Sequence, residues 1–292
     1  MEEPLTDPAG PTESGAGIPW WGAILLPAFA LVSSMMVFVL LAWLRAAVRG
    51  GTDTEAFAAL SRDPLNHAAI QAVAFGAAIA AGLLLFHRGR GLRRSLALSS
   101  VPAGAVLLAV IAGLALQLLL SEIGNLVLEL HPMPIEQQLA RQRMVEPTDL
   151  WHALPIIVGL VVVAPVTEEL LFRGLLLPGI ARRHGATAGL LLTSIAFALV
   201  HLEPTAVVPA AIAGWVLGVV VLRTGSAVPA IAVHAGVNAL PLLLPERLLP
   251  IHGFNTVSED VYHLPVPLLT GALVVAAAAL FAMFRIVDAG AR

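Results

Sequence analysis

Residues 156–173 read IIVGLVVVAPVTEELLFR, an apolar run that ends in two adjacent carboxylates and an arginine. The apolar stretch extends from about residue 152 to residue 177, which is long enough for one helix to cross the hydrocarbon core of a bilayer. Each ionisable group near the bilayer centre costs about 2.5–3.5 kcal/mol on insertion scales. Three such groups in one membrane segment therefore indicate a functional site.

The composition of the whole chain agrees with a membrane protein. Of its 292 residues, 58% are hydrophobic and 12% are charged, whereas soluble domains carry about 25% charged residues. High hydrophobicity excludes intrinsic disorder, and the absence of cysteine excludes a disulfide scaffold and thiol chemistry. A net charge of −3 disfavours a nucleic-acid-binding protein, which would carry an excess of basic residues.

Apolar runs recur along the chain, and none alternates apolar and polar residues as barrel strands do. We therefore predict an all-α fold, a polytopic membrane helix bundle of about eight transmembrane helices. The expected spans are residues 20–44, 65–86, 102–121, 152–177, 186–202, 207–222, 227–245 and 266–286.

The segments between and around these runs suggest five regions. They are a disordered acidic N-terminal tail (1–18), N-terminal transmembrane helices (19–130), a polar interfacial segment (131–150), a core that carries the acidic motif (151–245), and a loop with the last transmembrane helix (246–292).

Arginine placement predicts the orientation in the membrane. All 16 basic residues are arginine, a bias that, with the abundant Ala, Gly and Pro, suggests a GC-rich genome and a prokaryotic cytoplasmic membrane. With eight spans, nine arginines fall on the side that holds both termini and six on the other. Because cytoplasmic loops carry more basic residues, both termini are expected in the cytoplasm.

The spacing within the decisive stretch assigns different roles to its charges. Glu169 and Arg173 lie four residues apart, on one helix face, where they can pair. Glu168 lies on a different face and has no such partner in its own helix, so it is available to another group. We expect Glu169 and Arg173 to support the structure and Glu168 to do chemistry.

Two later spans carry polar residues at the same four-residue spacing. Phe197 and His201 share one helix face, and His234 and Asn238 share another. Buried polar groups in lipid must find partners, so these clusters are expected to face Glu168. At 1.5 Å per residue, we expect the meeting point to be displaced toward the side that holds the termini.

Together these motifs resemble the CPBP family of intramembrane proteases, which includes the type II CAAX prenyl endopeptidases and the bacteriocin-processing and Abi-type proteins. The similarity rests on Glu-Glu-x-x-x-Arg at 168–173, Phe-x-x-x-His at 197–201 and His-x-x-x-Asn at 234–238. It covers about residues 150–245. The resemblance implies that Glu168 and His201 activate water, and that His234 and Asn238 stabilise the oxyanion. It assigns Glu169 and Arg173, with Phe197 beside them, to structural support.

A metal-dependent mechanism is the alternative within the same family. Glu168, His201 and His234 would form a two-His, one-carboxylate zinc site, although the chain has no His-Glu-x-x-His signature. We favour a mechanism that requires no cofactor, with zinc as the alternative.

The resemblance predicts an intramembrane endopeptidase whose partners are the lipid bilayer and a membrane-associated protein or peptide substrate, not nucleic acid. The competing hypothesis is a catalytically inactive scaffold, or a peptide- or lipid-binding protein, on the same fold. A transporter is disfavoured because no internal repeat is evident and the polar residues gather in one half of the chain. The enzyme is preferred because every matched position of the motifs is filled.

Overall fold

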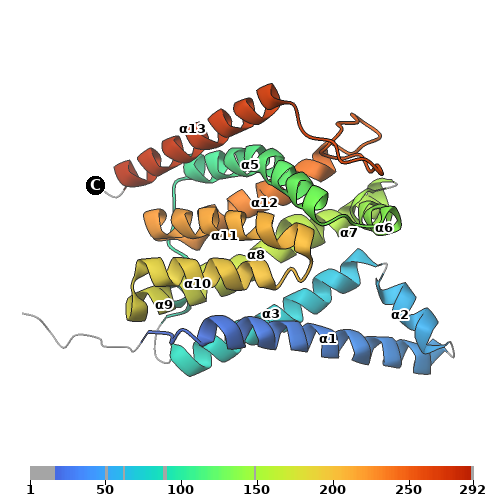
Figure 1. Cartoon of the computed structure of the whole chain (residues 1–292). Coiled ribbons are helices and arrows are strands. Elements are labelled where there is room, and N and C mark those ends of the chain that lie inside the picture. The colour runs from blue at the N-terminus through green and yellow to red at the C-terminus, as the bar shows by residue number, and fades with distance from the viewer. Residues whose placement is uncertain (1–16, 50–51, 62, 88–90, 148, 291–292) are drawn as a thin grey trace, which may run out of the picture.

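The computed structural model describes residues 17–49, 52–61, 63–87, 91–147 and 149–290. Within these ranges the chain is helical and contains no strand, which confirms the predicted all-α class. Figure 1 shows the long helices running side by side in alternating directions. The helices are α1 (Gly22–Arg49), α2 (Asp53–Ser61), α3 (Pro64–Phe86), α4 (Leu92–Ser95), α5 (Ala103–Leu130), α6 (Ile135–Val145), α7 (Leu150–Ile157), α8 (Ala164–Glu169), α9 (Leu177–His184), α10 (Ala186–Leu199), α11 (Pro204–Thr224), α12 (Ala227–Leu243) and α13 (Val266–Gly290), with π-helices at η1 (Val158–Val163) and η2 (Leu170–Leu176).

Six described segments are long and apolar enough to cross a membrane. One of them is the continuous helical rod Trp151–His184, which joins α7, η1, α8, η2 and α9. The remaining two expected spans, α10 and α12, are shorter, with 14 and 17 residues. At 1.5 Å per residue α10 is about 21 Å long, so it does not cross a full hydrocarbon core alone. The expected count of about eight agrees approximately with the structure.

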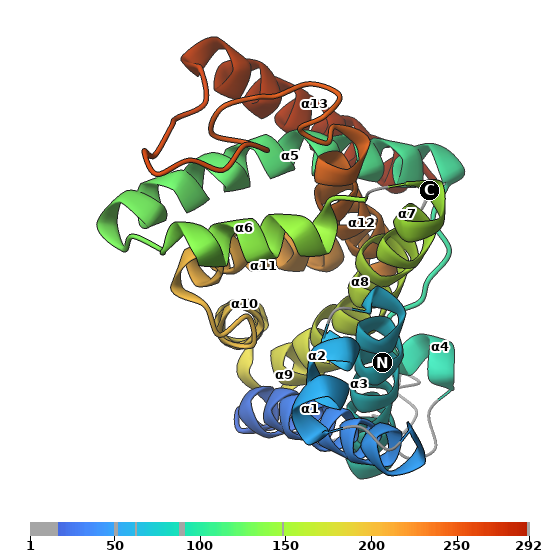
Figure 2. The same cartoon turned by 90° about the vertical axis from the view of Figure 1, so that its right-hand side faces the viewer.

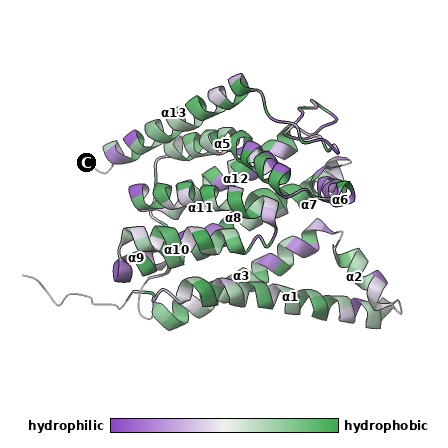
Figure 3. Ribbon diagram, in the orientation of Figure 1, coloured by the Kyte–Doolittle hydropathy of each residue, from purple (hydrophilic) through white to green (hydrophobic). Residues whose placement is uncertain are grey.

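The outer surface of the bundle is apolar, as a bilayer requires. Met35 on α1, Phe281 on α13 and Ile195 on α10 expose 71%, 66% and 52% of their surface. Figure 3 shows hydrophobic residues along the long helices and hydrophilic residues gathered on α6 and at the outer end of α9. Large exposed apolar patches of this kind mark membrane contact in a helical protein. The chain is an integral membrane protein.

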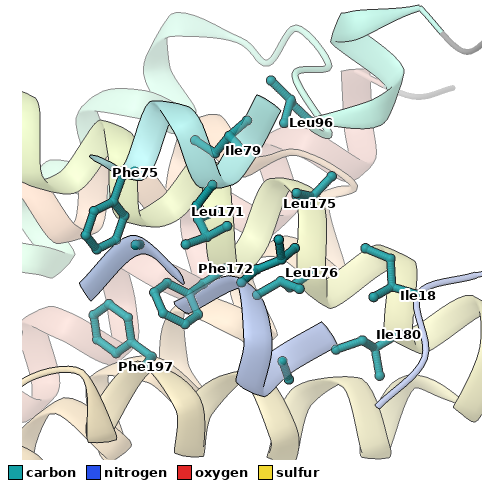
Figure 4. Packing of buried hydrophobic residues seen from close by; sticks show 14 of the residues in the cluster. Ile18, Phe75, Ile79, Leu96, Leu171, Phe172, Leu175, Leu176, Ile180 and Phe197 are labelled. Atoms are coloured by element: carbon teal, nitrogen blue, oxygen red, sulfur yellow. The ribbon is translucent and has the colours of Figure 1, made fainter. Parts of the chain in front are cut away.

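A buried cluster joins the N-terminal helices to the rod that carries the acidic motif. Phe75 and Ile79 of α3 pack with Leu171 and Phe172 of η2. Figure 4 shows these side chains together, with Phe197 of α10 on the opposite side of Phe172. The N-terminal helices therefore pack directly against the rod that carries the acidic motif.

Helices α5 and α12 cross at almost backbone contact because both carry glycine there. A Cβ atom added to Gly113 would lie 2.0 Å from the carbonyl oxygen of Val233, and one added to Gly236 would lie 2.5 Å from that of Val110. Such close approach is available only to small residues. The crossing fixes α12 where it presents His234 inward.

The ends of the helices divide into two groups. Figure 1 shows α4, α9 and the C-terminal end of α13 at one end of the bundle, and α2, α6 and the segment before α13 at the other. We call the first the arginine end, because the last turn of α9 contributes Arg182 and Arg183 to it. We call the second the α6 end. Residues 1–16 of the predicted disordered tail (1–18) lie outside the described residues. Ile18, which the prediction placed in that tail, is fully buried against Gly179.

We predict that the arginine end faces the cytoplasm. Because the chain has no cysteine, single-cysteine variants report location without background. His184→Cys at the arginine end should react with a membrane-impermeant maleimide only after the cells are permeabilised, and Asp260→Cys at the α6 end should react in intact cells. The reverse pattern would invert the predicted orientation.

Candidate functional site

A fully buried carboxylate joins two of the sequence motifs. Glu169 and Arg173 are both 0% exposed, and Nη1 of Arg173 donates to Oε1 of Glu169 at 3.1 Å. Nδ1 of His234 lies 3.0 Å from the same oxygen. The expected ion pair is present, and it has a third member. His234, which we expected to face Glu168, is held by Glu169.

Arg173 reaches further, to a third helix. Its Nη2 donates to the carbonyl of Gly214 on α11 at 3.1 Å, and a Cβ atom added to Gly214 would lie only 3.0 Å from that nitrogen. The guanidinium carbon lies 4.1 Å from the centroid of the Phe197 ring, within the range of a cation–π interaction. One arginine therefore ties η2 to α10 and α11.

Phe197 lies at the centre of these groups. Its ring centroid is 5.0 Å from that of His201 and 5.8 Å from that of His234, both in edge-on contact. It also contacts the Phe172 ring at 5.3 Å. The three expected support residues, Glu169, Arg173 and Phe197, thus form one buried unit beneath the two histidines.

The π-helix η1 explains the position of Asn238. The N–H of Ala164 bonds to the carbonyl of Gly159, one residue further back than in an α-helix, and Pro165 has no N–H to offer. The carbonyl of Leu160 therefore loses its usual partner. Nδ2 of Asn238 donates to it at 2.8 Å, which leaves the second N–H of this amide free for another acceptor.

His201 is oriented by its own helix. Its Nδ1 lies 2.9 Å from the carbonyl oxygen of Phe197. A carbonyl only accepts, so Nδ1 carries the proton, and in the neutral ring Nε2 keeps its lone pair. His201 is exposed at the end of α10, which places it at the α6 end of the bundle.

An inner cavity of about 300 Å³ collects these side chains. Its walls come from α5, α10, α11 and α12, and its polar members include His201, His234 and Asn238. Apolar residues such as Leu116, Ala213 and Leu217 line much of the remainder. Since His201 and Thr205 belong to the α6 end, the cavity is displaced toward that end. The prediction of a site displaced toward the termini was wrong, because it ended the fourth span at residue 177, whereas the rod continues to His184 and carries Glu168 further from that end.

Glu168 does not contact His201 among the described residues. Its Oε1 accepts a hydrogen bond from Nε2 of Gln71 on α3 at 2.8 Å, and the same nitrogen lies 3.5 Å from Oγ1 of Thr167. Gln71 is the residue of the candidate site that the sequence analysis missed. The one local signal for it is an amide inside the apolar run that follows Asn66 and His67. It fixes the position of the carboxylate from outside the three motifs.

The proposed zinc ligands do not form a metal-binding group in the described part of the chain. No set of three or more His, Asp or Glu side chains there is close enough to hold an ion. His234 contacts Glu169 through Nδ1, and Glu168 accepts from Gln71 at Oε1. The choice between zinc and a mechanism without a cofactor stays a prediction.

Comparison with known proteins supports one family. Residues 150–240 match the family model described as type II CAAX prenyl endopeptidase Rce1-like. No curated protein and no solved structure matches the chain. The matched residues contain all three motifs, and this family suggests an intramembrane endopeptidase. The resemblance to the CPBP family is confirmed over this segment of the chain.

Proposed function

We propose that this protein is an intramembrane endopeptidase that hydrolyses a peptide bond of a membrane-associated protein or peptide. The observation that carries the proposal is the inner cavity, which brings His201, His234 and Asn238 together inside a bundle of apolar helices. Its apolar walls suit a hydrophobic segment of the substrate. Its polar groups are of the types that activate water and stabilise an oxyanion.

Water activation is assigned to Glu168 and His201. The lone pair on Nε2 of His201 can accept a hydrogen bond from water, because Nδ1 is occupied by the Phe197 carbonyl. Glu168 takes the proton as the water oxygen attacks the carbonyl carbon. Catalytic hydrogen bonds commonly tighten only in the substrate complex, so the carboxylate and the imidazole are expected to meet across the bound water.

Oxyanion stabilisation is assigned to Asn238 and His234. Asn238 retains one amide N–H beyond its bond to Leu160. Glu169 orients the His234 ring through Nδ1, and Nε2 can donate to the oxyanion when it carries a proton. One such donor contributes about 3–4 kcal/mol in other hydrolases. When the tetrahedral intermediate collapses, the C–N bond breaks and the proton on Glu168 passes to the leaving amine.

Replacing either water-activating residue should abolish cleavage. Glu168→Gln removes the proton acceptor, and His201→Ala removes the acceptor that orients the water. We expect a loss of at least about 100-fold in turnover, within the range contributed by general acid–base catalysis. The measurement compares protein termini by mass spectrometry in cells that express the wild type or a variant, and the substrate precursor should accumulate with either variant.

Matched controls separate chemistry from folding. Glu136→Gln on α6 and His184→Ala at the end of α9 change exposed side chains of the same types and should leave processing intact. All four variants should insert into the membrane at wild-type levels. Normal processing by both Glu168→Gln and His201→Ala would contradict the protease and favour a binding protein.

Gln71 should matter for turnover more than for binding. Gln71→Leu removes the donor that holds Oε1 of Glu168 while preserving an apolar volume in the span. Because this bond positions the carboxylate, kcat should fall about tenfold or more while KM changes little. The measurement is steady-state cleavage by the reconstituted protein, and Asn66→Ala on the same helix, whose amide bonds Asp63, is the control. An unchanged kcat would contradict the positioning role.

A further inference from the structure

A second pocket lies against the inner cavity at the α6 end. We call it the outer pocket. Its volume is about 320 Å³, and it shares Ser121, Gly124 and Thr205 with the inner cavity. Figure 2 shows α6 running alongside the end of α5 and above α11, which places the elements that line it beside those of the inner cavity. The two spaces are therefore adjacent compartments of one site.

The walls of the outer pocket are fixed by hydrogen bonds between distant segments. Nε2 of Gln142 on α6 donates to Oε2 of Glu246 at 2.6 Å and to the carbonyl of Asn255 at 3.2 Å. Nδ2 of Asn125 on α5 donates to the carbonyl of Gly253 at 2.7 Å. These bonds tie α5 and α6 to the segment that follows α12. The pocket is therefore formed in advance, as binding sites usually are.

The described charged residues that line the outer pocket leave it with a net negative charge. Its one described cation, Arg141, forms an ion pair with Glu203 and also lies 3.3 Å from the Thr205 hydroxyl. Glu146 and Glu246 also line the pocket, both are partly buried, and neither has a cationic partner in the described part of the chain. Partial burial strengthens their field, because apolar walls focus it into the cleft.

We propose that the outer pocket binds a lysine or arginine side chain of the substrate, next to the apolar segment that the inner cavity holds. Glu146 and Glu246 would accept hydrogen bonds from the cationic group, and charge-assisted bonds of this kind are among the stronger ones in proteins. The inference rests on the proposed function and names the substrate class: an apolar peptide segment flanked on one side by basic residues.

Binding to an inactive variant tests this class without relying on cleavage. The full chain carrying Glu168→Gln is reconstituted in zwitterionic lipid nanodiscs and titrated with dye-labelled peptides that are acetylated and amidated at their ends. The peptides share an apolar core and differ only in a flanking pair, Lys-Lys or Gln-Gln. The lysine peptide should bind about tenfold more tightly at low salt, and the preference should shrink as salt is raised.

Charge removal inside and outside the pocket locates the effect. Adding Glu146→Gln and Glu246→Gln should reduce the lysine preference to within about twofold, because both carboxylate charges are removed. The Glu246→Gln change keeps an oxygen that can accept from Gln142, so the pocket should keep its shape. The matched control, Glu136→Gln with Glu259→Gln, removes two exposed charges from the same end and should preserve the preference.

Three results would overturn the inference. The first is that both peptides bind equally well or that neither binds. The second is a lysine preference that survives the Glu146→Gln and Glu246→Gln changes. The third is a lysine preference that the control pair also abolishes. Any of them leaves the cleavage experiment on Glu168 and His201 unaffected. Conversely, a normal lysine preference in a protein whose wild type cleaves nothing would overturn the protease and retain the pocket.

Discussion

The buried carboxylate of Glu169 determines how the rest of the site is assembled. It accepts from Arg173 and lies 3.0 Å from Nδ1 of His234. The carboxylate of Glu169 and the guanidinium of Arg173 are both removed completely from solvent. A lone charge in this environment would cost several kcal/mol, so each member requires the others. Because Arg173 also bonds the Gly214 carbonyl and packs on Phe197, the constraint extends over η2, α10, α11 and α12.

The irregular backbone of the central rod makes this arrangement possible. Two π-helices flank α8, and π-bulges are frequent at functional sites. The first releases the Leu160 carbonyl, which Asn238 then binds. In the second, the N–H of Leu177 bonds to the carbonyl of Phe172. Asn238 of α12 thus satisfies a backbone carbonyl that an apolar environment leaves without solvent.

Local spacing predicted the parts of the site that lie within one helix. Glu169 pairs with Arg173 four residues away, and Phe197 and His201 share a face, as the sequence indicated. Helical periodicity carries this information because residues i and i+4 are neighbours on any α-helix. It also predicted an all-helical membrane protein, since apolar length alone defines a candidate span.

Contacts between helices could not be predicted in the same way. Gln71 binds Glu168 from a span without any motif, and His234 binds Glu169 rather than Glu168. Nothing in the local pattern specifies the rotation of one helix against another, which here depends on glycine contacts such as Gly113 with Gly236. The depth of the site was mispredicted because the apolar pattern ends near residue 177, whereas the rod continues to His184.

A double-mutant cycle on Glu169 and Arg173 tests the central claim most directly. The free energy of unfolding is measured in lipid for the wild type, Glu169→Gln, Arg173→Met and the double variant. We predict that each single change costs about 3–5 kcal/mol, because it leaves an unpaired buried charge. The double change should cost clearly less than the sum, since no charge then remains unpaired. Additive losses, or single losses below about 1 kcal/mol, would contradict the view that this buried network organises the site.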